Sequence, residues 1–345
     1  MALPSLPILP TSVVGSHSIP SWLTVALEQI RQGAFGRFDI RETLDDAVTV
    51  ALDDQIRAGV DVIADGEMRR QDFIMSFYDR LAGLKPLEPA RKVGVPLYDR
   101  MTVYTTVDRI TAPTGLGIVE EFRFAQGRTD RPLKVTCPGP LTLTTSLKLA
   151  APYKDPLEAV EDLSQIIRAE LEQLVEVGAD FLQIDEPAFH PLFGKDPKEV
   201  VALFNRTVAG LRAKVAMHIC FGNLYGRPRT RRTYAPILPH IRDLRADQLV
   251  LEFANRELAE LPLWKEHGGE KELAAGLIDI KSFHPESPEE VADRIRTALR
   301  LTGVPPHRLW VVPDCGFCFV PRWLAFAKMK AMVDGARIVR RELGG

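Results

Sequence analysis

The stretch DFLQIDE at residues 180–186 has the pattern of a buried parallel strand. It is short, its interior at residues 181–184 is mostly apolar, and it ends in two acidic residues. Seven other runs share this character: 12–16 (SVVGS), 61–67 (DVIADGE), 133–137 (LKVTC), 214–220 (KVAMHIC), 248–253 (QLVLEF), 276–282 (GLIDIKS) and 309–314 (LWVVPD). Hydrophobic strands of this kind are typical of a parallel sheet whose faces are covered by helices.

Helical patterns lie between most of these runs. Three segments have apolar side chains at helical spacing, namely residues 43–58, 156–177 and 287–301. The third begins with Ser287 and Pro288, a typical N-cap and first helical residue. Eight strand–helix units in 345 residues predict one (β/α)8 TIM barrel over residues 1–345 rather than an open, doubly wound sheet.

Two further patterns refine this prediction. Residues 92–124 alternate between apolar and polar side chains, which predicts a β-hairpin excursion between early units of the barrel. No G-x-G-x-x-G motif follows the first run, so nothing in the sequence supports a dinucleotide-binding fold.

The composition excludes several classes of protein. With 44 Lys and Arg against 46 Asp and Glu, the net charge of -2 argues against a nucleic-acid-binding surface. The N-terminal stretch is rich in proline and has neither a basic start nor an apolar run long enough for a membrane segment. We therefore expect a cytoplasmic protein whose first residues form a loop before the first strand. Four cysteines are too few for a disulfide scaffold in a chain of this length.

Ionisable residues gather where the predicted strands end. In a barrel of this kind the chemistry lies at the carboxyl ends of the strands, because the loops that follow them converge there. The residues at these ends are Ser16, His17, Asp65, Glu67, Cys137, Asp185, Glu186, His218, Cys220, Glu252, Lys281, Asp314 and Cys315. Packing explains any one of them, since strands also end where solvent begins, but not the whole set.

A metal site is predicted from His218, Cys220, Glu252 and Cys315. His218 and Cys220 are two residues apart, so on an extended strand they point the same way. Imidazole and thiolates are the ligands that Zn²⁺ prefers. One alternative is a closed structural zinc site in which Cys318 replaces Glu252, although we interpret Cys318 as a small buried residue. The C-x-x-C spacing of Cys315 and Cys318 lacks the helix start expected of a redox motif.

Carboxylates at two other strand ends suit a substrate. Asp185 and Glu186 either bind an ammonium group, hold a metal, act as acid and base, or simply cap a helix. Glu67 faces the same mouth, and the turn Gly15–Ser16 offers backbone N–H groups and a hydroxyl that suit a carboxylate.

Several motifs resemble those of the C-terminal catalytic barrel of cobalamin-independent methionine synthase, in the uroporphyrinogen decarboxylase/methionine synthase superfamily. The similar segments span most of the chain in order: VVGSH (13–17), DGEMRRQDF (65–73), CPGPLTL (137–143), QIDEPAF (183–189), HICFGN (218–223), LEFA (251–254), GLIDIKS (276–282) with SPEEVADRIR (287–296), and LWVVPDCGF (309–317). The long members of this family carry a second barrel, whereas this chain resembles the short, single-barrel members.

The resemblance implies a zinc-dependent thiol S-methyltransferase that converts homocysteine to methionine. It implies that His218, Cys220, Glu252 and Cys315 bind zinc, and that Gly15, Ser16, Glu67 and Asp185 hold the amino-acid end of homocysteine. A free thiol is mostly protonated at neutral pH, and zinc binds it as the thiolate. Two thiolates and a carboxylate around the ion keep the bound sulfur electron-rich, so that it attacks an electrophilic carbon.

The sequence departs from this family where the methyl donor binds. A tryptophan that contacts the folate is replaced by Ser146, an acidic residue by Pro191, and the histidine that protonates the departing folate by Lys281. A lysine is a poor proton donor at neutral pH unless desolvation lowers its pKa. His284, three residues further on, is the other candidate for this role.

These departures leave the donor open. It is methyltetrahydrofolate, a methylated corrinoid protein, or another electrophile such as an epoxide attacked by coenzyme M. Two other functions also remain, a metal-free lyase of the decarboxylase type and an accessory protein with a closed structural zinc site. The lyase has no need of the four metal-ligand residues.

Overall fold

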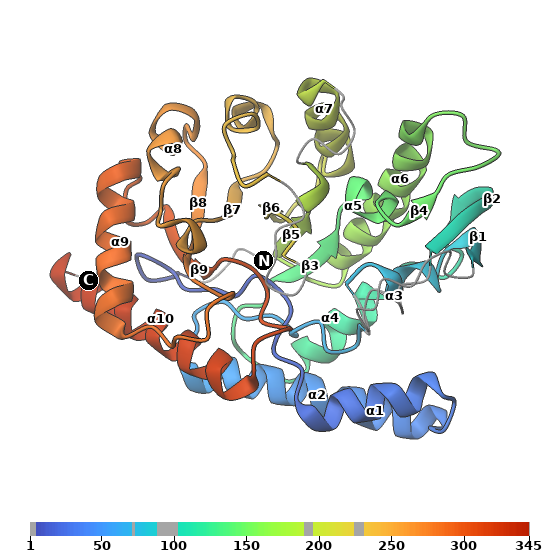
Figure 1. Cartoon of the computed structure of the whole chain (residues 1–345), viewed down its shortest axis with the longest axis horizontal. Coiled ribbons are helices and arrows are strands. Elements are labelled where there is room, and N and C mark those ends of the chain that lie inside the picture. Colours follow the sequence, from blue (N-terminus) through green and yellow to red (C-terminus); the bar gives the residue numbers. More distant parts are fainter. Residues whose placement is uncertain (1–4, 71–72, 88–102, 190–195, 224–230, 345) are drawn as a thin grey trace.

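The computed structural model describes residues 5–70, 73–87, 103–189, 196–223 and 231–344. A parallel sheet lies at its centre and helices cover the outside (Figure 1). Neighbouring strands pair in the order β3, β5, β6, β7, β8, β9. Their bounds are Val135–Pro138, Phe181–Asp185, Lys214–Ile219, Gln248–Glu252, Glu272–Ile278 and Leu309–Pro313.

The first two predicted strands close this sheet into a barrel through single bridges. Thr11 pairs with Val311 in β9, and Ser12 pairs with Val62. Ile63 then pairs with Leu133, just before β3, and all three bridges are parallel. The ring of eight strand segments predicted from the sequence is thus confirmed, and its closing seam consists of short pairings.

Two of the three predicted helices begin and end within one residue of the predicted bounds, whereas the first begins six residues earlier than predicted. The segments predicted at 43–58, 156–177 and 287–301 are α2 (Arg37–Ala58), α6 (Pro156–Glu176) and α9 (Pro288–Thr302). The Ser287 hydroxyl accepts a hydrogen bond from the Glu290 N–H at the start of α9. The remaining helices are α1 (Ser21–Arg31), α3 (Met75–Tyr78), α4 (Ile118–Gln126), α5 (Pro140–Thr144), α7 (Pro197–Thr207), α8 (Leu261–His267) and α10 (Arg322–Glu342), with short 3₁₀ turns η1 (Pro187–Phe189), η2 (Leu238–Asp243) and η3 (Ala254–Arg256).

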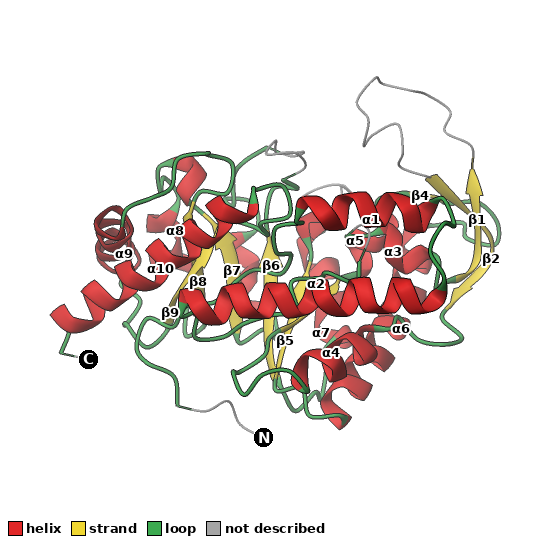
Figure 2. Cartoon of the chain, turned by 90° about the horizontal axis from the view of Figure 1, so that it is seen from below, coloured by secondary structure: helices red, strands yellow, loops and turns green. Residues whose placement is uncertain are grey.

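A β-hairpin projects from one end of the barrel, but not with the predicted bounds (Figure 2). Its antiparallel strands are β1 (Ala82–Leu87) and β2 (Val103–Thr111), and a short strand, β4 (Leu147–Lys148), pairs with β2. Residues 92–102 of the predicted excursion lie outside the described part of the chain. The prediction that the hairpin extends to residue 124 was wrong, because residues 118–126 form α4.

The interior of the barrel has an apolar floor built from one side chain of nearly every strand. It comprises Val14, Val62, Phe181, Ala216, Val250, Ala274, Trp310 and Val312, all of them buried. Successive side chains of a strand point to opposite faces, so residues two or four positions further along also face inward. By this alternation, the side chains of Asp185, His218, Cys220 and Glu252 also face inward, at the mouth of the barrel above the apolar floor.

Candidate metal centre and substrate site

Three of the four predicted metal ligands meet at the mouth of the barrel. One ligand atom from each of His218, Cys220 and Cys315 lies within 4.8 Å of the other two. The sulfur atoms of Cys220 and Cys315 are 3.9 Å apart. His218 and Cys220 are buried, and Cys315 is partly buried. Residues nearly a hundred positions apart in the chain therefore form one cluster, as the strand-end pattern predicted.

The imidazole of His218 is oriented for metal binding. Its Nδ1 lies 2.8 Å from Oδ1 of Asp185, and because a carboxylate only accepts, Nδ1 must carry the proton. Nε2 is buried and has no hydrogen-bond partner among the described residues. A histidine whose second nitrogen is held by a carboxylate is the usual arrangement of a metal ligand. Burial disfavours the imidazolium, but the hydrogen bond and the charge of Asp185 raise the pKa of His218.

The two cysteines differ in their acidity. Contact with the Cys220 thiol lowers the pKa of Cys315 to about 6, with burial opposing this shift and His218 adding to it. The contact with Cys315, together with burial, raises the pKa of Cys220 well above its ordinary value. Cys315 is therefore the first of the pair to ionise, and a thiolate is the form of cysteine that binds metals.

Glu252, the fourth predicted ligand, lies beside this cluster but is not one of its three members. It ends β7 and is 0% exposed. Its Oε2 accepts a hydrogen bond from the side chain of Asn223, and its Oε1 is 3.6 Å from Nζ of Lys281. Cys318 does not belong to the cluster of described ligand atoms either.

Two carboxylates predicted to bind substrate lie next to the cluster. Asp185 is 2% exposed, and its Oδ2 has no hydrogen-bond partner in the described part of the structure. Burial raises the pKa of Glu67 to about 7; Arg70 opposes this shift, and the nearby charge of Asp185 adds to it. A buried pair of acids with an open oxygen suits an ammonium group.

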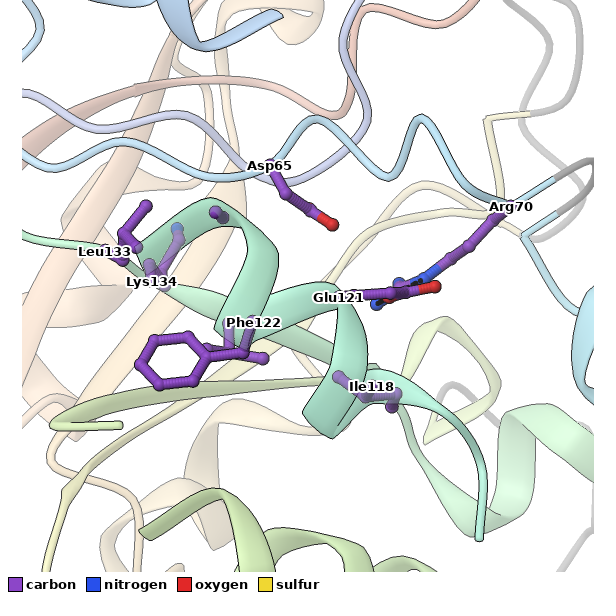
Figure 3. A pocket seen from close by; sticks show the side chains of 9 residues that line it. Asp65, Arg70, Ile118, Glu121, Phe122, Leu133 and Lys134 are labelled. Atoms are coloured by element: carbon purple, nitrogen blue, oxygen red, sulfur yellow. Dashed lines mark hydrogen bonds and ion pairs between the residues drawn. The ribbon is translucent and has the colours of Figure 1, made fainter. Parts of the chain in front are cut away.

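Arg70 and Thr136 hold Glu67 in place, and sequence reasoning did not single out either of them. The hydroxyl of Thr136 donates to Oε1 of Glu67 over 2.7 Å, and Nη1 of Arg70 donates to the same oxygen over 3.2 Å. Figure 3 shows Arg70 and Glu121 pointing toward each other, where Nη2 donates over 2.8 Å. The cavity lined by these two residues has about 10 Å³ of free volume, which suits one water molecule rather than a substrate.

The turn Gly15–Ser16 connects the acids to the cluster. A Cβ atom on Gly15 would lie 2.6 Å from Oε1 of Glu67, so only glycine permits this approach. A Cβ atom on Gly316, the residue after Cys315, would lie 2.0 Å from Oγ of Ser16, and the Ser16 carbonyl accepts from the Phe317 N–H over 2.7 Å. The predicted substrate-binding residues and the metal-ligand cluster therefore form one continuous site.

Glu186, by contrast, caps a helix. Its carboxylate accepts hydrogen bonds from the Leu141 and Thr142 N–H groups and from the Thr142 hydroxyl at the start of α5. The helix-capping alternative thus holds for Glu186. Asp314 is engaged in the same way, because it accepts from the N–H groups of residues 253–255.

The two candidate proton donors lie in different surroundings. Lys281 was expected at the end of a strand over 276–282, but β8 ends at Ile278, and Lys281 lies in the turn that follows. Its side chain is 5% exposed and points at Glu252. The side chain of His284 is 63% exposed, with Nε2 3.3 Å from Glu290. The structure does not bring His284 to the cluster. Ser146 is partly buried, whereas Pro191 lies outside the described residues.

Comparison with known proteins identifies the family. The model of the cobalamin-independent synthase catalytic domain matches residues 9–338. This chain belongs to that family. The methionine synthase of Saccharolobus solfataricus is 35% identical over 340 residues, which cover 98% of this chain and 97% of that protein. The methionine synthase of Sulfurisphaera tokodaii is 36% identical over 339 residues, covering 98% and 94%.

A solved structure has the same fold. It is a B12-independent methionine synthase from Shewanella sp. W3-18-1 in complex with selenomethionine, with a TM-score of 0.82, 28% identity and coverage of 97% of this chain and 99% of that one. This chain is therefore a methyltransferase of the cobalamin-independent methionine synthase type, and the resemblance inferred from its motifs is confirmed. None of its described helices has both the length and the apolar character that a bilayer crossing requires.

Proposed function

We propose that this enzyme methylates the sulfur of homocysteine to give methionine, at a zinc ion held by His218, Cys220, Cys315 and Glu252. The observation that carries this proposal is the cluster of three ligand atoms within 4.8 Å of one another, with a buried Nε2 on His218. One imidazole and two thiolates with a nearby carboxylate are a donor set that fits zinc better than a hard cation. Bound there, zinc would keep the substrate thiol in its thiolate form.

The protein's own residues would orient the amino-acid end of the substrate. Glu67 and Asp185 would hold the ammonium group, and Ser16 with the backbone of Gly15 would hold the carboxylate. This assignment is supported by the open Oδ2 of Asp185 and by the contact of the glycine–serine turn with both Glu67 and Gly316. The selenomethionine bound to the Shewanella protein is an amino acid of the same size and class as methionine, the proposed product.

The proposed methyl transfer needs no oxidant or reductant. A bond forms between the sulfur and the methyl carbon, and the bond from methyl to donor breaks with its electron pair left on the donor. We propose methyltetrahydrofolate or a close relative as this donor. The proton that such a donor takes up on leaving has two candidate sources, Lys281 and His284.

Two measurements test this function. Purified enzyme should retain about one zinc ion per chain after dialysis, and homocysteine should shift the zinc X-ray absorption edge toward more sulfur ligation. Metal-free protein from zinc-replete cells would contradict the proposal. An edge that no small thiol changes would favour a closed structural site.

The methyl donor can be identified by assaying the zinc-loaded enzyme with a panel of donors and thiol acceptors. It should contain mono- and polyglutamyl methyltetrahydrofolate, methylcobalamin with and without a corrinoid protein, and a simple epoxide, each with homocysteine and with coenzyme M. We expect methionine from methyltetrahydrofolate and homocysteine. If a thioether forms only from another pair of donor and acceptor, the thiol chemistry of the proposal stands and the proposed donor is replaced.

A further inference from the structure

Lys281 and Glu252 are a buried pair of opposite charges next to the metal-ligand cluster. Their side chains are 5% and 1% exposed, and Nζ lies 3.6 Å from Oε1. Neither of these two atoms has a hydrogen-bond partner among the residues that the structure describes. Lys281 lies in the turn after β8, where its backbone N–H donates to Oδ1 of Asp279 over 2.8 Å.

The charged groups around this lysine explain its position. Lys281 interacts electrostatically with Asp314 and with Cys315 as well as with Glu252. Arg256 is another cation close to Glu252, but its Nη1 donates to the Glu260 carboxylate, and its Nη2 donates to the backbone carbonyl of Glu252 rather than to the side chain. Lys281 is therefore the cation that balances the Glu252 carboxylate.

We propose that Lys281 is a built-in competitor of the metal ion for Glu252 and thereby lowers the metal affinity of this site. This inference rests on the proposed zinc site. The ligand atoms of His218, Cys220 and Cys315 lie within 4.8 Å of one another, whereas Glu252 is not a member of this cluster and is paired with Lys281 and Asn223. A carboxylate that has a cation of its own to return to leaves a metal more readily than one that would be left unpaired in the interior.

The sign of the effect follows from two contributions that agree. Removing the charge of Lys281 leaves Glu252 without its cation in the metal-free protein, which destabilises that state relative to the metal-bound one. It also removes a positive charge close to a divalent ion. Both contributions strengthen metal binding.

The experiment is a zinc titration of the full chain in competition with a chromophoric chelator. Lys281→Met should bind zinc about tenfold more tightly than the wild type. Lys271→Met is the matched control, because Lys271 precedes β8 at the opposite end of the same strand and its Nζ donates to the carbonyls of Leu244 and Ala246. Its zinc affinity should equal that of the wild type.

A double-mutant cycle tests whether the effect acts through Glu252. In a Glu252→Gln background, Lys281→Met should change the zinc affinity by less than about twofold. An unchanged or weaker affinity of Lys281→Met overturns the proposal, and so does a full tenfold gain that persists without Glu252.

Thermal unfolding gives a readout that needs neither activity nor a donor. With the metal chelated, Lys281→Met and Glu252→Gln should each melt below the wild type, and the double variant should recover part of the loss because no buried charge is left alone. An additive loss would contradict the pairing. Failure of the wild type to bind zinc would instead overturn the proposed function, which separates the two outcomes.

Discussion

The mouth of the barrel is built in two ways, from strand ends on one side and from the loop after β8 on the other. Asp185, His218 and Cys220 come from neighbouring strands in fixed register, with Asp185 paired to His218 across β5 and β6. All three are buried; Asp185 is hydrogen-bonded to His218, and His218 lies in one cluster with Cys220. Lys281 and His284 are three residues apart in one loop, yet one is buried against Glu252 and the other is exposed. Register fixes the direction of a side chain at a strand end, whereas a loop places each residue individually.

The largest effect should come from breaking the strand-end cluster. We expect Cys220→Ser to lose zinc and all measurable methyl transfer, because a serine hydroxyl is a poor zinc ligand. Cys137→Ser is the control, since Cys137 is a buried thiol near the end of β3 that donates to the carbonyl of Pro138 and is not a member of the metal-ligand cluster. Zinc content measured by mass spectrometry checks both. Retention of zinc in Cys220→Ser would place the metal elsewhere.

The second-largest effect should distinguish the roles of Asp185 and Glu186, the two adjacent carboxylates at the end of β5. Asp185→Asn should weaken homocysteine binding by about 100-fold, or about 2.7 kcal/mol, because it removes a charge from the proposed ammonium site and a partner from His218. Glu186→Gln should leave this affinity within about threefold and lower the free energy of unfolding by about 1 kcal/mol through the cap of α5. Calorimetric titration and denaturant unfolding measure the two quantities. Equal losses of affinity would contradict the assignment.

A smaller effect should appear in the pH dependence of binding. The raised pKa of Glu67, about 7, means that its carboxyl is protonated below that pH and cannot hold an ammonium group. The affinity for methionine should therefore rise with pH by up to about tenfold per unit below pH 7 and level off above it. Methionine is the ligand of choice because its sulfur does not ionise. Glu67→Gln should give a flat profile between pH 6 and 8, and an unchanged slope would exclude Glu67.

The smallest effect is expected in the loop. His284→Ala should change the turnover rate by less than about twofold, since its ring lies at the surface beside Glu290 and such exposed pairs contribute about 0.5 kcal/mol. Initial rates under saturating substrates provide the measurement. A loss of more than about tenfold would show that the loop moves His284 to the reacting atoms.

The contrast between strand ends and loops also describes what the sequence predicts well. The apolar runs predict the barrel because each strand is buried on both faces, and the cluster follows from the alternation of side chains. Which carboxylate of Asp185 and Glu186 faces the mouth also depends on this alternation: Asp185 shares its face with Phe181 and Gln183, and Glu186 points to α5. Arg70 and Asn223 were missed because their roles depend on tertiary contacts.

The error at residues 118–124 has an identifiable cause. The helix α4 has no serine, threonine, aspartate or asparagine at its start, where Gly117 stands in the left-handed region with φ 85°. Its first N–H groups are instead capped by Glu170 of α6, which accepts from Ile118 and Val119 over 2.7 and 3.1 Å. A cap supplied from about fifty residues away leaves no local signal in the sequence.

The seam of the barrel has a consequence for how the enzyme is made. Thr11 has its strand partner at Val311, so the first barrel segment has no neighbour on that side until β9 has been synthesised. Arg340 of α10 then donates to the carbonyls of Ile8 and Leu9, and Cys315 lies two residues after the end of β9. Cys315, the last of the candidate metal ligands along the sequence, is therefore synthesised together with the strand that closes the barrel, so a nascent chain cannot assemble the three-ligand cluster before the barrel can close.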